Sequence, residues 1–215
     1  MLEAIFLFIT LLTLSLFYIG TGKDLRLVLI FIVWQLLIGL LSYFEVFKEK
    51  PQLFPMAIVA TILLSVLCLR MITVSKLKRN FLIGIHIVRI PVELCLYALY
   101  IESQVPEIMT FSGWNFDVLI GISAGTIFIY ELVKNNTVAR KSFIVWNYIG
   151  LLFLSFIVII AILSSPLPIQ QFAFEQPNVA LFQFPYCFLP TCIVPLVYLS
   201  HILLIKDTIN YNSQK

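Results

Sequence analysis

One apolar stretch of the chain holds three ionisable side chains: "IHIVRIPVELCLY", residues 85–97. His86, Arg89, Glu93 and Tyr97 fall on one face of a helix there, because each residue turns a helix by about 100°. A charge at the centre of a bilayer costs on the order of 2.5–3.5 kcal/mol, so such groups face the protein interior and pair. The simplest pairing joins Arg89 to Glu93, one helical turn apart, and a pairing of Arg89 across to another helix stays open.

This polar face indicates that the protein binds or passes a small polar or anionic solute, or protons. Arg89 would bind the anion or keep Glu93 ionised, while Glu93 and His86 would exchange protons. Pro91 lacks an N–H to donate to the carbonyl of Ile87, which predicts a kink beside these side chains.

Asp117 opens a later apolar segment, where a carboxylate favours the helix N-terminus. We expect it to cap that helix, or to lie at the outer mouth of the same cavity. The predicted solute-binding residues are His86, Arg89, Glu93, Tyr97 and Asp117. The alternative is a structural or partner-binding subunit, in which these side chains only fix one helix to its neighbours.

A second alternative is a redox protein or enzyme that uses the chain's two histidines, His86 and His201. Each lies near the inner end of its predicted span, so the two are expected to share a depth. Two imidazoles on facing helices can hold a haem iron, and together with Glu93 they can hold a transition metal. The leading hypothesis requires no cofactor.

Several functional classes lack the residues they need. The motifs HExxH, GxSxG and GxxxxGK[ST] do not occur, which favours a role other than enzyme. The last apolar segment has no lysine at mid-depth for a retinal Schiff base. No basic stripe with interleaved aromatic residues is found, so nucleic acid is not expected as a partner.

The composition predicts an all-α protein in a bilayer, because 61% of the 215 residues are hydrophobic and 12% are charged, against about 25% charged in soluble proteins. The N-terminal stretch lacks a basic region and is too long for a cleavable signal, so we interpret it as a first span. The chain is predicted to form one domain, 1–215, a seven-transmembrane-helix bundle with spans at about 2–20, 27–44, 54–74, 81–101, 115–133, 142–163 and 186–206.

The distribution of basic residues predicts the orientation of these spans. Two basic residues, Lys48 and Lys50, fall on the side that also carries Glu45, Glu49, Glu102, Glu107 and Glu175. Ten fall on the other side: Lys23, Arg26, Lys76, Lys78, Arg79, Lys134, Arg140, Lys141, Lys206 and Lys215. We therefore expect the N-terminus outside and the C-terminus in the cytoplasm.

The longest connection, residues 164–185, mixes phenylalanines with glutamines and Glu175. Connections of this length are uncommon unless they have a function. Two interpretations stay open: a lid over the outer mouth of the bundle, or an aromatic belt at the membrane interface.

Other polar and small residues predict contacts between helices. Gly121 and Gly125 form a GxxxG step, which permits close helix packing. Glu131 is expected to reach the inner interface or to pair with Lys134. Asn147 is predicted to make an interhelical hydrogen bond.

Four stretches carry a resemblance to a known family: "HIVRIPVE" (86–93), "MTFSGWNFD" (109–117), "IVWNYIGLL" (144–152) and "QQFAFEQPN" (170–178). Along nearly its whole length the chain resembles an uncharacterised family of multi-span bacterial inner-membrane proteins. The resemblance implies an integral, multi-pass protein of the plasma membrane and implies no activity.

Overall fold

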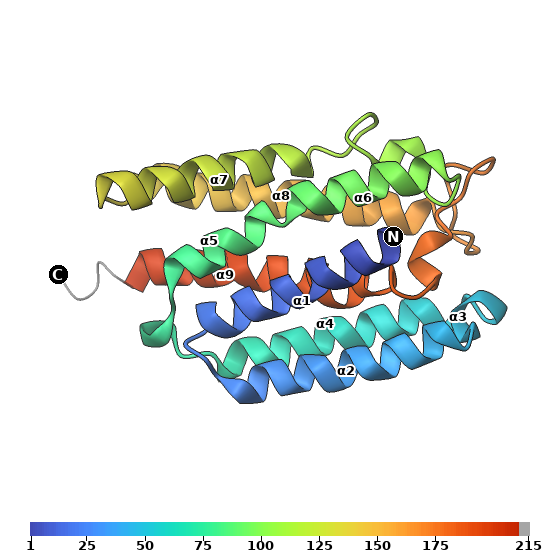
Figure 1. Ribbon diagram of the computed structural model, residues 1–215, viewed down its shortest axis with the longest axis horizontal. Helices are drawn as coiled ribbons and strands as arrows, with labels where there is room; N and C mark the ends of the chain where they lie inside the picture. Colours follow the sequence, from blue (N-terminus) through green and yellow to red (C-terminus); the bar gives the residue numbers. More distant parts are fainter. Residues whose placement is uncertain (211–215) are drawn as a thin grey trace.

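The computed structural model describes residues 1–210, which are helical and contain no strand (Figure 1); Lys215 lies outside the described residues. The long helices are α1 (Leu2–Gly20), α2 (Leu25–Tyr43), α4 (Leu53–Met71), α5 (Arg79–Ile87), α6 (Arg89–Ile101), α7 (Asp117–Lys134), α8 (Arg140–Leu163) and α9 (Val194–Asn210). Short elements are α3 (Val46–Glu49), η1 (Val74–Lys76), η2 (Glu107–Met109), η3 (Ala180–Phe182) and the π-helix η4 (Leu189–Ile193).

Six helical segments of residues 1–210 are long and apolar enough to cross a membrane. They are Leu2–Gly20, Leu25–Tyr43, Leu53–Met71, Arg79–Ile101, Arg140–Leu163 and Leu189–Asn210. The helix predicted at 115–133 forms as α7, but it is not among these six. Its 18 residues include Asp117, Glu131 and Lys134. The structure thus confirms the all-α class and indicates a multi-pass membrane protein.

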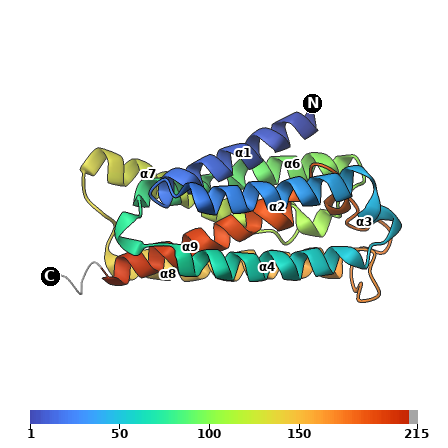
Figure 2. The same ribbon diagram turned by 90° about the horizontal axis from the view of Figure 1, so that it is seen from below.

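The outer surface of the bundle is apolar, as a lipid-facing surface requires. α2 and α4 contribute most clearly, with large side chains exposed along both helices: Leu29, Ile32, Val33, Leu36, Met56, Val59, Ile62 and Leu63. α9 lies near the centre of the bundle in both views (Figures 1 and 2), and most of its side chains are buried.

The predicted kink beside Pro91 is present. α5 ends at Ile87 and α6 begins at Arg89, with a turn at Val88 between them. The N–H of Val88 donates to the carbonyl of Ile85 at 3.2 Å, a tighter turn than an α-helix makes. The break changes the direction in which the side chains of α6, including Arg89, point relative to those of α5.

α7 begins near the middle of the bundle, beside the junction of α5 and α6 (Figure 1). Its first residue, Asp117, bonds to Arg89, and Arg89 lies about 18 Å below the end of α6 at a rise of 1.5 Å per residue. The prediction that Asp117 lies at the outer mouth is therefore wrong. Residues 102–116 return from the far end of α6 in irregular conformation apart from η2, with Val105, Met109 and Thr110 buried among the helices. Irregular backbone at membrane depth is tolerated where protein surrounds it.

Residues 164–185 cover the end of the bundle opposite the basic turns, which is the end that we expect outside. The N–H groups of Val179 and Ala180 both donate to the carbonyl of Gln104 at 3.1 Å. Gln176 Nε2 donates to the carbonyl of Tyr100 at 3.0 Å, and Ser42 Oγ donates to the carbonyl of Phe182 at 2.8 Å. This is the position that a lid needs, and its opening stays a prediction.

Candidate functional site: a buried charged network

Arg89 is the centre of a polar network between α6, α7 and α9. Its Nη1 donates to Asp117 Oδ1 at 3.1 Å, and its Nη2 lies 3.0 Å from His201 Nε2. The three residues are 3%, 6% and 0% exposed. Of the two pairings left open for Arg89, the structure shows the one across helices, to Asp117, and not the one with Glu93. Arg89 is the first residue of α6, and helical side chains lean towards the helix N-terminus, here away from Glu93 and towards His201.

Glu93 is held by Asn115, from the irregular segment before α7. Asn115 Nδ2 donates to Glu93 Oε1 and, at 3.0 Å, to the carbonyl of Met109, while Asn115 Oδ1 accepts from the N–H of Asp117 at 3.0 Å. Glu93 Oε2 is buried and has no hydrogen-bond partner among residues 1–210. The sequence analysis did not identify Asn115 as a site residue. The one indication was its position two residues before Asp117, because asparagine side chains there accept hydrogen bonds from the unpaired N–H groups at the start of a helix.

The two histidines meet, which confirms that they share a depth. Their ring centroids are 3.9 Å apart, with the rings inclined at 30°. Asn147 Oδ1 lies 2.8 Å from His201 Nδ1, so the predicted interhelical hydrogen bond of Asn147 is confirmed. Ser200 Oγ lies 3.2 Å from His86 Nε2 and donates to the carbonyl of Leu82 at 2.8 Å.

These contacts assign the histidine tautomers. Because Arg89 can only donate, Nε2 of His201 accepts, and its Nδ1–H donates to Asn147. The hydroxyl proton of Ser200 goes to Leu82, so Nε2–H of His86 donates to Ser200. The remaining nitrogen of His86, Nδ1, is buried without a partner among the described residues. His201 is thus a neutral imidazole, and His86 keeps one nitrogen, Nδ1, that can take up a proton.

Aromatic and small residues of α8 enclose the histidines. Trp146 meets the ring of His86 edge-on, with centroids 5.3 Å apart, and its Nε1 donates to Ser123 Oγ at 2.9 Å. Gly150 lies directly against His201, where an added Cβ would overlap the imidazole. The rings therefore have little room to move sideways.

The geometry bears on the haem and metal alternative. Rings in stacking contact leave no space for a porphyrin between them, and both nitrogens of His201 are already bonded. Within residues 1–210 no group of three or more His, Cys, Asp or Glu side chains is placed to hold a metal ion. A cofactor at His86 and His201 would require the two rings to separate.

Four of the five predicted site residues come together: His86, Arg89, Glu93 and Asp117. The fifth, Tyr97, stacks on Phe111 with ring centroids 4.8 Å apart. No hydrogen bond joins Tyr97 to the network among the described residues. It belongs to an aromatic cluster with Tyr100 and Phe111, in the part of α6 away from the network.

A second, partly buried ion pair lies nearer the basic end of α5 and α7. Arg79 Nη2 and Nε donate to the two carboxylate oxygens of Glu131 at 2.9 and 3.1 Å, and the guanidinium lies 3.6 Å from the centroid of the Phe143 ring. Arg79 Nη1 also donates to Thr208 at 3.2 Å. The prediction that Glu131 pairs with Lys134 or reaches the interface is wrong. Arg79 gives it a bidentate, partly desolvated partner, which is the stronger arrangement.

Two cavities, of about 460 Å³ and 380 Å³, are present in the described part of the chain, and neither is lined by a side chain of the charged network. No family model, curated protein or solved structure matches the chain.

Proposed function

We propose that the chain is a multi-pass protein of the bacterial inner membrane, with its N-terminus outside, that carries protons on the network of His86, His201, Glu93 and Asp117. The observation that carries the proposal is the contact of these titratable side chains around Arg89, with a free basic nitrogen at His86 and an unpartnered oxygen at Glu93. The site needs no cofactor to exchange protons.

Charge balance supports a proton on this network. Arg89 and Asp117 compensate each other at 3.1 Å, which leaves the carboxyl of Glu93 without a cation of its own. An uncompensated buried charge is strongly unfavourable. A proton on Glu93 makes the group neutral, and its release leaves a charge that the next proton relieves.

The same geometry favours protons over an anionic solute. Nη1 and Nη2 of Arg89 already contact Asp117 and His201, and Nε is buried without a partner among the described residues. Arg89 lines neither of the two cavities, so an anion would need space that the packing around Arg89 does not offer. A proton, by contrast, can bind to a side chain without any cavity beside it.

Proton flux into liposomes tests the proposal. The purified chain is reconstituted with a pH-sensitive dye inside, and a potassium gradient with valinomycin drives protons inward. Glu93→Gln keeps the shape of the side chain and the acceptor for Asn115, but cannot take up a proton. We expect it to reduce flux to the level of empty liposomes, and His201→Gln to reduce it at least tenfold.

Ser155→Ala is the control, because it removes an interhelical hydrogen bond, the part-buried contact to Tyr198 at 2.8 Å, that lies outside the charged network. It should conduct as the natural chain does. Unchanged flux in Glu93→Gln would assign the network a purely structural role.

A further inference from the structure

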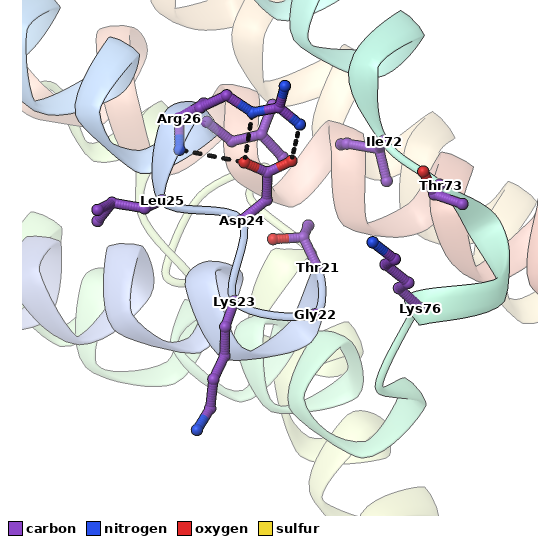
Figure 3. A pocket seen from close by; sticks show the side chains of 10 residues that line it. Thr21, Gly22, Lys23, Asp24, Leu25, Arg26, Ile72, Thr73 and Lys76 are labelled. Carbon is purple, nitrogen blue, oxygen red and sulfur yellow. Dashed lines mark hydrogen bonds and ion pairs between the residues drawn. The ribbon is translucent and has the colours of Figure 1, made fainter.

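A cavity of about 380 Å³ lies at the basic end of the bundle, away from the charged network. It is formed where the turn between α1 and α2 meets the turn after α4 (Figure 3). Gly22, at φ +80°, brings the first turn against the backbone of Lys76, so close that a Cβ there would overlap it. The walls of the cavity are thus fixed by packing between two connections far apart in sequence.

The polar lining of this cavity carries excess positive charge. Arg26 binds both carboxylate oxygens of Asp24, at 3.2 and 3.0 Å, and this hydrogen bonding lowers the pKa of Asp24, so the two charges compensate each other. Lys23 and Lys76 also line the cavity and have no ion-pair partner among residues 1–210. Figure 3 shows the Lys76 side chain beside Thr73, on the far side of the cavity from Arg26.

The apolar lining connects this cavity to the lipid-facing surface. Leu25, Leu27 and Ile72 complete the lining. They lie at the adjoining ends of α2 and α4, the two helices with exposed apolar side chains along their length. A ligand with a charged head and an apolar tail fits this combination, because its tail can continue along α2 and α4.

We propose that this cavity binds the phosphate group of an anionic phospholipid, with Lys76 as its principal cation. Figure 3 shows the Lys23 side chain turned away from Arg26 and Lys76, which leaves Lys76 as the cation directed towards the cavity. Thr73 also lines the cavity. The depth agrees with such a ligand, since basic residues beside helix ends lie at the level of lipid headgroups. The proposal is independent of proton transfer in the charged network.

Lipid titration of the full chain in mild detergent tests the proposal, with bound lipid counted by native mass spectrometry. The probes are phosphatidylglycerol, phosphatidylcholine and inorganic phosphate. We expect tight binding of phosphatidylglycerol only, weakened about fivefold in Lys76→Gln, because one lysine near anionic lipid contributes on the order of 1 kcal/mol. Ile72→Trp fills the cavity without a change of charge, and should weaken binding as much or more.

Lys141→Gln is the matched control, since Lys141 is exposed at the same basic end and does not line the cavity. Equal losses in Lys76→Gln and Lys141→Gln would overturn the proposal in favour of diffuse attraction to a basic surface. Equal binding of phosphatidylcholine would overturn the role of charge. If inorganic phosphate displaced phosphatidylglycerol from the cavity, the ligand would be free phosphate from solution and not a lipid.

Discussion

At the scale of single residues, the charged network depends on each partner that compensates Arg89. Its guanidinium is 3% exposed and depends on the carboxylate of Asp117 for charge balance. Removal of one partner of a buried pair costs more than the pair contributes, because the remaining charge stays buried. This asymmetry makes the pair suitable for a test of stability.

Asp117→Asn should destabilise the protein by about 3–5 kcal/mol, because it leaves the Arg89 charge without a counterion. Thermal unfolding in detergent measures the change. Asp24→Asn is the control, because it keeps a helix cap and weakens only a surface pair with Arg26, whose side chain is 74% exposed. We expect little change in the control. Equal unfolding temperatures for Asp117→Asn and the natural chain would show that Arg89 is compensated by another group.

The histidine pair predicts the absorption of the purified protein. With His201 bonded through both nitrogens and stacked on His86, we expect no Soret band between 350 and 700 nm, and no stoichiometric metal. A spectrum on protein in mild detergent, with metal analysis of the same sample, is the measurement. A Soret band that disappears in His86→Ala and His201→Ala would return the site to redox chemistry.

At the scale of helices, the lengths of the apolar segments predicted the positions of the helices well. They did not predict which side chains of different helices are in contact. The seven predicted segments all form helices, with ends within a few residues, since apolar runs of this length have few other solutions in a bilayer. The partner of Arg89 was not predictable, because Asp117 is 28 residues away and its depth depends on the irregular path of residues 102–116. Periodicity shows which face is buried and does not show what that face meets.

The GxxxG step of α7 is a second case in which the sequence pattern does not show which residue packs against a neighbouring helix, and it can be tested. A Cβ at Gly121 would lie 2.8 Å from Ile90 Cγ1, whereas nothing lies within 4 Å of a Cβ at Gly125. Gly121→Ala should therefore destabilise the bundle by about 1–3 kcal/mol through overpacking. Gly125→Ala should be neutral or stabilise it by up to about 1 kcal/mol, because alanine favours a helix interior. Unfolding of the two variants, side by side, is the measurement, and equal effects would contradict the close approach of α6 at Gly121.

At the scale of the whole molecule, α7 decides how many times the chain crosses the membrane. Its composition alone sets it apart from the six clear spans, because Asp117, Glu131 and Lys134 lie within it. Two of these charges are compensated inside the bundle, by Arg89 and Arg79. Their cost in the bilayer is therefore much smaller than composition indicates.

We therefore expect residues 102–134 to complete a crossing, the first part as irregular chain and the second as a helix about 27 Å long. Labelling of single introduced cysteines with an impermeant maleimide, on right-side-out vesicles, tests this. The natural Cys68, Cys95, Cys187 and Cys192 are all buried and give a low background. Glu107→Cys should react from outside, and Asn136→Cys only after the vesicles are opened.

Glu49→Cys and Lys76→Cys calibrate the two sides, because they flank α4, one of the six clear spans. Reaction of Glu107→Cys and Asn136→Cys from the same side would mean that α7 returns without crossing. In that case the basic turn before α8 would lie opposite the basic turns before α2 and α5. Such a split would place these basic turns, which lie at one end of the bundle (Figure 1), on opposite sides of the membrane, against the preference of basic residues for the cytoplasmic side. A crossing by α7 keeps them together.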